Sequence, residues 1–148
     1  LEHARERSLN NGKIFNFINA ASEELPFSDN MFDAYSISFA LRNVSDIQKS
    51  LEEAYRVLKP GGGFYAMDFG PNVSSWLQKP YDLYLQYALP FLGRVIAADK
   101  DAYQYLADSI QNFYSPQEIT EFLTICGFQD INYYPLNAGI VNIFYGCK

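Results

Sequence analysis

The stretch SFALRN places a serine and an arginine at the end of an alternating apolar run and before a helix signal. Ser38 falls at the carboxyl end of the expected strand, where open α/β sheets bind ligands. Arg42 stays protonated in proteins, so its guanidinium offers charge and hydrogen-bond donors rather than a base. The structural alternatives are a serine that closes a strand and, for Arg42, a surface ion pair with Asp46 or Glu53.

Other reactive side chains give no metal constellation. Cys126 and Cys147 are far apart in sequence and form no CxxC pair, and His3 is the one histidine. Two cysteines define no disulfide framework, so a reducing compartment is the default expectation.

Composition favours a well-filled core. The 148 residues are 49% apolar and include 12 Phe, 12 Tyr and one Trp, which excludes a disordered chain. The net charge of −6 and the absence of a basic stripe argue against nucleic acid as a partner. Residues 76–98 form the longest apolar stretch, but charges and two prolines exclude a membrane span.

Periodicity predicts the elements that position these residues. S-x-x-Q at Ser45 and S-P-x-E at Ser115 each resemble a capping box that starts a helix. Pro90 is expected to kink or divide the third helical segment. The expected helices are 1–9, 45–58, 76–97, 101–110 and 116–126, and the expected strands are 14–18, 32–39, 64–69, 128–135 and 140–146.

Strands that alternate with helices predict an α/β fold with a mostly parallel sheet and an antiparallel C-terminal edge hairpin. A nucleotide-binding sheet of this type has a glycine-rich turn after its first strand, and none is visible. Gly61-Gly62-Gly63 follows a helix and precedes a strand, the wrong order for cradling a phosphate. We therefore expect residues 1–148 to be the C-terminal portion of a single larger domain.

Four strings carry a family resemblance: EELPFSDNMFDAYSISFALRNV, AYRVLKPGGGFYAMDF, DAYQYLADSI and GFQDINYYPLNAGIVNIFYG. Together they resemble the UbiE-type ubiquinone/menaquinone C-methyltransferases, which are class I S-adenosylmethionine-dependent methyltransferases. RVLKPGG marks only the superfamily, whereas LRNV with the YQYL and GIV segments is more specific. The resemblance implies a Rossmann-like fold whose first two strands would precede Leu1, and a piece without them is expected to be unstable as a monomer.

The resemblance implies S-adenosylmethionine as cofactor. Its adenine would lie against Ala21 and Ser22, although Ala21 lacks the side-chain acceptor usual in the family. Ser38 would contact the methionyl part of the cofactor.

The implied reaction is C-methylation of a quinol ring, in which a ring phenolate directs the adjacent carbon to the sulfonium methyl. Arg42 would stabilise the anion, and Asn43 would orient Arg42 or cap the loop. Asp99 is the expected proton acceptor and Tyr103 the expected wall of the ring pocket, near Asp101 and Tyr105. The alternative for either aspartate is an acidic helix N-terminus. Helix 76–97 would wall the polyprenyl tail or simply pack in the core.

The resemblance implies a polyprenyl quinol as substrate, with DAYQYLADSI favouring the benzoquinol branch. It also implies other quinone-biosynthesis proteins, a homodimer and peripheral membrane contact as partners. The expected location is the matrix side of the mitochondrial inner membrane in a eukaryote, or the cytoplasm in a bacterium. Two alternatives stay open: a catalytically inactive methyltransferase-fold subunit of a larger complex, and a methyltransferase acting on a different small molecule.

Overall fold

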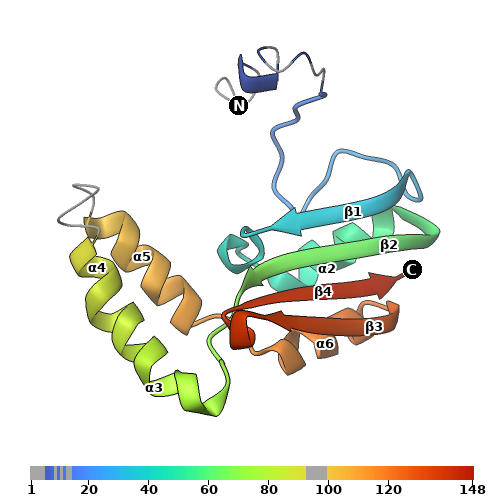
Figure 1. Ribbon diagram of the computed structural model, residues 1–148. Helices are drawn as coiled ribbons and strands as arrows, with labels where there is room; N and C mark the ends of the chain where they lie inside the picture. Colours follow the sequence, from blue (N-terminus) through green and yellow to red (C-terminus); the bar gives the residue numbers. More distant parts are fainter. Residues whose placement is uncertain (1–5, 9, 11, 13–14, 93–99) are drawn as a thin grey trace.

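A computed structural model of the chain describes residues 6–8, 10, 12, 15–92 and 100–148 (Figure 1). The strands are β1 (Phe32–Ser38), β2 (Leu58–Phe69), β3 (Gln129–Leu136) and β4 (Val141–Cys147). The α-helices are α2 (Ile47–Val57), α3 (Ser75–Leu83), α4 (Leu89–Leu92), α5 (Lys100–Gln111) and α6 (Pro116–Ile125). Short 3₁₀ turns form η1 (Leu41–Asn43) and η4 (Asn137–Gly139), and η2 (Tyr84–Ala88) is a π-helix.

The described strands form one sheet in the order β1-β2-β4-β3. β1 runs parallel to β2, while β4 lies between β2 and β3 and is antiparallel to both. The α/β class and the antiparallel edge hairpin are confirmed, but this part of the sheet is not mostly parallel. β3 runs in the same direction as β2, and the hairpin reverses the chain between β3 and β4. Because β4 is inserted between β2 and β3, it is antiparallel to both of them.

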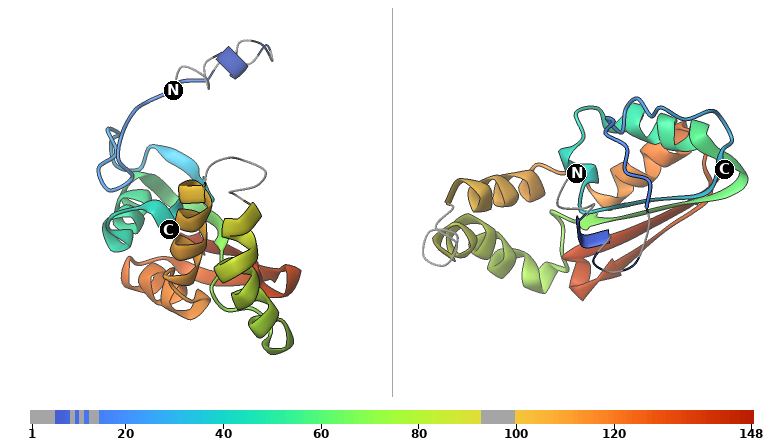
Figure 2. Two further views of the ribbon diagram at one scale, coloured as in Figure 1. Left: turned by 90° about the vertical axis from the view of Figure 1, so that its left-hand side faces the viewer. Right: turned by 90° about the horizontal axis from the view of Figure 1, so that it is seen from above.

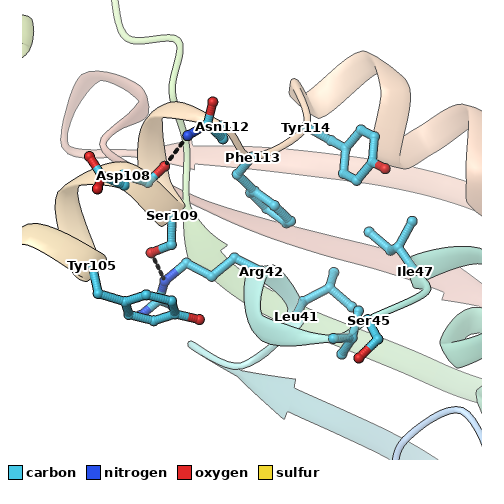
Figure 3. A pocket seen from close by; sticks show the side chains of 11 residues that line it. Leu41, Arg42, Ser45, Ile47, Tyr105, Asp108, Ser109, Asn112, Phe113 and Tyr114 are labelled. Atoms are coloured by element: carbon cyan, nitrogen blue, oxygen red, sulfur yellow. Dashed lines mark hydrogen bonds between the residues drawn. The ribbon is translucent and has the colours of Figure 1, made fainter. Parts of the chain in front are cut away.

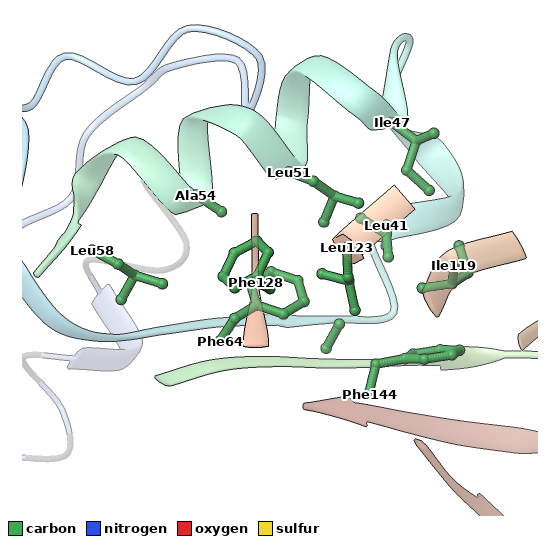
Figure 4. Packing of buried hydrophobic residues seen from close by; sticks show 11 residues of the cluster. Leu41, Ile47, Leu51, Ala54, Leu58, Phe64, Ile119, Leu123, Phe128 and Phe144 are labelled. Carbon is green, nitrogen blue, oxygen red and sulfur yellow. The ribbon is translucent and has the colours of Figure 1, made fainter. Parts of the chain in front are cut away.

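One face of the sheet is covered by α2 and α6 (Figures 1 and 2). Apolar residues recur along α2 at helical spacing and form one face of the helix. The apolar side chains of α6 pack against this face and against the central strands. Figure 4 shows this core, in which most side chains are almost fully buried. Its members are Leu41, Ile47, Leu51, Ala54, Leu58, Phe64, Ala66, Ile119, Leu123, Phe128 and Phe144.

Helix starts differ in how well local sequence predicts them. The Ser115 capping box of α6 is confirmed, with Glu118 binding back to the Ser115 N–H and Pro116 opening the helix. The box expected at Ser45 is wrong, because Asp46 is the N-cap of α2 and its carboxylate accepts from the Lys49 N–H. Glu23 accepts the backbone N–H groups of Ser45 and Asp46, and this distant contact moves the helix start by one residue.

The strand expected at residues 14–18 is wrong for its described part, residues 15–18, which form no strand and leave Phe15 and Ile18 exposed. A strand requires a neighbour to pair its backbone N–H and C=O groups. No described strand lies along the outer edge of β1, so these residues have no partner of that kind.

None of the described helices covers the second face of the sheet (Figures 1 and 2). Side chains alternate across a strand, so Tyr65 of β2 points away from the α2 and α6 layer and is 46% exposed. Tyr134 and Leu136 of β3 are exposed on the same face. This face supplies apolar surface that a further layer would bury.

The segment α3-η2-α4 and α5 form an arm beyond the carboxyl ends of β1 and β2 (Figures 1 and 2). The helix expected at 76–97 was predicted to kink or divide at Pro90; instead α4 continues through Pro90, and the turns before it widen into the π-helix η2. The N–H of Leu89 bonds to the carbonyl of Tyr84, five residues earlier. Proline in a helix removes a donor and crowds the preceding turn, and π-turns relieve such strain.

A carboxylate-guanidinium clamp on α2 fixes the loop before β1. Arg56 donates to the carbonyls of Leu25 (3.1 Å) and Phe27 (2.8 Å) and to the Asp29 carboxylate (2.7 Å). Glu53 accepts the Leu25 N–H at 2.8 Å and pairs with Arg56 at 2.6 Å. The clamp therefore holds the loop between Leu25 and Asp29 against α2 just before β1 begins.

Glu53→Gln is expected to lower the free energy of unfolding of the full-length protein by about 1 kcal/mol at neutral pH. Hydrogen bonds from Arg56 and from the Leu25 N–H hold the pKa of Glu53 below its ordinary 4.5. A depressed pKa stabilises the folded state above the ordinary value, and this stabilisation is lost as pH falls through the lower folded value.

Urea unfolding at a series of pH values measures the difference. Glu52→Gln is the matched control, because the Glu52 carboxylate accepts from Gln48 on its own helix. Two results would contradict a stabilising role of the clamp. One is a decrease in the free energy of unfolding by Glu53→Gln that stays the same in acid, and the other is a decrease no larger than that caused by Glu52→Gln.

Candidate functional site

Arg42 lies in η1, directly after the carboxyl end of β1. Phe39 makes the turn between them with φ of +53°, a left-handed conformation that a bulky residue rarely adopts. Its N–H bonds to the Met67 carbonyl at 2.8 Å, so pairing with β2 holds the turn in place. The turn therefore directs Arg42 back over the end of β2.

Asp68 of β2 is the ion-pair partner of Arg42. The Nη1 atom lies 2.6 Å from the Asp68 carboxylate, and the Arg42 backbone N–H donates to the same carboxylate at 3.1 Å. The Asp68 side chain is 0% exposed and that of Arg42 only 10%. The surface ion pair considered above is wrong, because Asp46 caps α2 and Glu53 binds Arg56.

Helix α5 contacts η1 through two further hydrogen bonds. Arg42 Nε donates to Ser109 Oγ at 3.3 Å, and the Tyr105 hydroxyl donates to Asn43 Oδ1 at 3.0 Å. Ser109 lies one helical turn after Tyr105. Figure 3 shows Arg42 reaching toward Ser109 at a pocket of about 350 Å³ between η1 and α5.

An apolar pocket of about 430 Å³ lies between the end of β2, the arm and Ile140, the residue before β4. Phe69 lines it, and the Arg42 guanidinium carbon lies 5.5 Å from the centre of the Phe69 ring. The arm therefore forms an apolar cavity one side chain away from a fixed cation. The lining residues are Phe69, Leu77, Pro80, Tyr81, Tyr84, Leu85, Leu89, Leu106, Ile110 and Ile140.

The candidate residues on the acceptor side are placed in different surroundings. Asp99 lies outside the described residues. Asp101 is exposed in the first turn of α5. Tyr103 is half-buried and packs against the cluster of Tyr81 and Leu85. The structure thus brings Arg42, Asn43 and Tyr105 together, and it places Tyr103 within the arm.

The candidate cofactor residues lie before β1 and at its end. Ala21 is exposed and lines a shallow pocket of about 370 Å³ formed by residues 19–21 and 24–26. Ser22 Oγ donates to Glu23 at 3.1 Å. Ser38 is exposed at the carboxyl end of β1. Backbone groups and small side chains around an open pocket fit one edge of an adenosyl group, with no side-chain acceptor at Ala21.

Asp68 is the site residue that the sequence analysis missed. Its signal is a single carboxylate in the apolar strand segment AMDF, which a buried strand tolerates only when the charge is paired. Among the described residues, no group of three or more His, Cys, Asp or Glu could hold a metal ion. None of the helices described is long and apolar enough to cross a membrane.

Comparisons with known proteins identify the family of the chain. The ubiE/COQ5 methyltransferase family matches residues 1–148. The ubiquinone/menaquinone biosynthesis C-methyltransferase UbiE of Brucella canis is 43% identical over 146 residues, covering 97% of this chain and 54% of the relative. The mitochondrial 2-methoxy-6-polyprenyl-1,4-benzoquinol methylase of Xenopus laevis is 46% identical over 127 residues, covering 86% and 41%. The chain spans about half the length of these relatives.

Solved structures show the fold. A methyltransferase from Thermotoga maritima, described as S-adenosylmethionine-dependent, superimposes with a TM-score of 0.68 at 19% identity, covering 99% of this chain and 70% of that one. One from Aquifex aeolicus gives a TM-score of 0.65 at 17% identity, covering 99% and 62%. The fold is that of class I methyltransferases, and the match over residues 1–148 shows that the chain belongs to the ubiE/COQ5 methyltransferase family.

Proposed function

We propose that the protein is an S-adenosylmethionine-dependent C-methyltransferase that methylates a polyprenyl benzoquinol ring in ubiquinone or menaquinone biosynthesis. One observation carries the proposal: a guanidinium fixed at a strand end lies beside an apolar pocket. A quinol with a prenyl tail needs both, a donor for its oxygen and an apolar wall for its tail. The names of the relatives from Brucella canis and Xenopus laevis support the same substrate class.

In this mechanism, Arg42 stabilises the phenolate that forms as the ring hydroxyl loses its proton. It acts by charge and hydrogen bonding, because a guanidinium stays protonated. Asp99 is our candidate acceptor for the hydroxyl proton, directly or through a water, and rests on the sequence resemblance alone. After the ring carbon takes the methyl group, that carbon loses its own proton to water and the ring oxygen is protonated again, which restores the aromatic quinol. Tyr103 supports the arm that walls the pocket.

Bound S-adenosylmethionine would supply an electrophilic methyl group on a sulfonium. Ser38 would contact its methionyl part, and Ala21 and Ser22 would meet its adenine through backbone groups. The uncovered sheet face and the free edge of β1 support a larger domain that completes this side of the cleft.

The relatives include bacterial and mitochondrial proteins. We propose that the protein lies on the matrix side of the mitochondrial inner membrane if the source is eukaryotic, and in the cytoplasm if it is bacterial. Peripheral contact with the membrane would give access to a prenylated substrate. Other quinone-biosynthesis proteins and a second copy of the chain are further proposed partners. A catalytically inactive subunit is less supported, since the Arg42 site is intact.

Arg42→Ala is expected to lower the rate of methyl transfer at least tenfold, because one charged hydrogen bond to the developing anion is worth roughly 1.5–3 kcal/mol. The measurement is transfer of labelled methyl from S-adenosylmethionine to a demethylated polyprenyl quinol. Arg42→Lys, which keeps the charge but loses the guanidinium fork, should also be slow. A rate within twofold of the unmodified protein for Arg42→Ala would refute the mechanism.

Tyr84→Ala is expected to raise the KM for a long-tailed acceptor about tenfold, because a bound tail would cover the partly exposed Tyr84 ring, and burying an aromatic side chain contributes roughly 1.5–3 kcal/mol. Both rings are exposed, but Tyr84 lines the apolar pocket, whereas Tyr87, the matched control on the same arm, does not. Acceptors with long and short tails should separate the two variants. Equal effects of Tyr84→Ala and Tyr87→Ala on long-tailed acceptors would argue against a tail in this pocket.

A further inference from the structure

Among the described residues, the Asp68 carboxylate accepts hydrogen bonds only from Arg42 and from the Phe69 N–H of its own strand. Its carboxylate accepts from Arg42 Nη1 at 2.6 Å, from the Arg42 backbone N–H at 3.1 Å and from the Phe69 N–H at 2.9 Å. Since its side chain is 0% exposed, it touches neither solvent nor an acceptor in the cleft. Any effect of Asp68 on chemistry must therefore pass through Arg42.

Two of the three guanidinium nitrogens of Arg42, Nε and Nη1, donate hydrogen bonds to protein groups. Nε donates to Ser109, and Nη1 donates to the Phe39 carbonyl at 2.9 Å and to Asp68. No described residue accepts from Nη2. Among the described residues no buried side-chain nitrogen is left without a partner, so Nη2 retains access to the space outside the protein. Two N–H groups of a rigid planar fork are thus held ready for another oxygen.

Stability alone does not account for this pair. A buried ion pair loses hydration on both partners, and apolar residues of similar volume often stabilise a fold equally well. Here Arg42 lines the pocket between η1 and α5, Phe69 alone separates its guanidinium from the apolar pocket, and Nη2 is accessible. A fixed direction of the guanidinium is the property that the pair supplies and apolar residues would not.

We propose that Asp68 is a positioning residue for methyl transfer: it orients the Arg42 guanidinium so that Nη2 faces the acceptor oxygen, with Ser109 supporting Nε. The proposal rests on the proposed function. Asp68 does not take up the proton, because its carboxylate is closed off by Arg42 and by the Phe69 N–H. Its role is to keep the cation in the orientation in which the phenolate forms.

The test uses the full-length protein with Arg42→Ala alone and with Arg42→Ala combined with Asp68→Asn. Methylguanidinium chloride, far below denaturing concentrations, is the probe for the space that the arginine leaves. We expect it to raise the melting temperature of Arg42→Ala more than that of the unmodified protein or the double variant. We also expect it to restore part of kcat in Arg42→Ala, with the KM for S-adenosylmethionine unchanged, and not to restore it in the double variant.

Stabilisation or rescue that is equal with and without Asp68 would overturn the positioning role. Absence of methyl transfer by the unmodified protein would instead overturn the proposed function, while the melting experiment would still report whether Asp68 holds a guanidinium. The two failures are therefore distinguishable.

Asp68→Asn and Asp68→Glu in the presence of Arg42 give a second test that does not depend on the folding of Arg42→Ala. Asp68→Asn should lower kcat about tenfold or more while changing the KM of the acceptor less, because the lost orientation matters most in the transition state. Asp68→Glu should recover part of kcat. Equal kcat for all three proteins would contradict the proposal.

Discussion

The ion pair between Arg42 and Asp68 joins the elements that make up the site. Asp68 belongs to β2 and Arg42 to the turn after β1, and Ser109 adds α5 to the same guanidinium. A buried charge that loses its partner is strongly destabilising, so these three elements cannot shift independently. Together with the hydrogen bond from the Tyr105 hydroxyl to Asn43, this contact ties the arm, and with it the apolar pocket, to the end of the sheet.

The rest of the fold keeps the two partners in register. β1 pairs in parallel with β2 and places Ser38 opposite Met67, one residue before Asp68. On its other side, Asp68 lies opposite Asn142 of β4, another buried polar side chain. The apolar core between the sheet and the helices α2 and α6 holds the strands in place. The left-handed turn at Phe39 then carries the chain over the end of β2, where Arg42 meets Asp68.

Local patterns predicted what local interactions decide. The Ser115 box, the apolar face of α2 and the C-terminal hairpin follow from residues near one another in sequence, and the structure confirms them. Asp68 escaped notice because its partner lies 26 residues away. The start of α2 depends on Glu23, also distant, and the run at residues 14–18 has a strand pattern but no described neighbour to pair with. The sequence predicted that Arg42 lies at the end of a strand. The orientation of its guanidinium depends on Asp68 and Ser109, which belong to other elements.

In the proposed mechanism, Arg42 presents Nη2 to the oxygen of the acceptor ring while Asp68 holds the opposite side of the guanidinium. A crystal structure of the full-length protein with a quinol acceptor bound would show whether the two contacts coexist. We expect a ring oxygen within hydrogen-bond distance of Nη2, about 2.7–3.2 Å, with the Asp68 contact kept and the tail in the apolar pocket. A ring oxygen bound away from Arg42, or an Arg42 that leaves Asp68 to reach it, would contradict this mechanism.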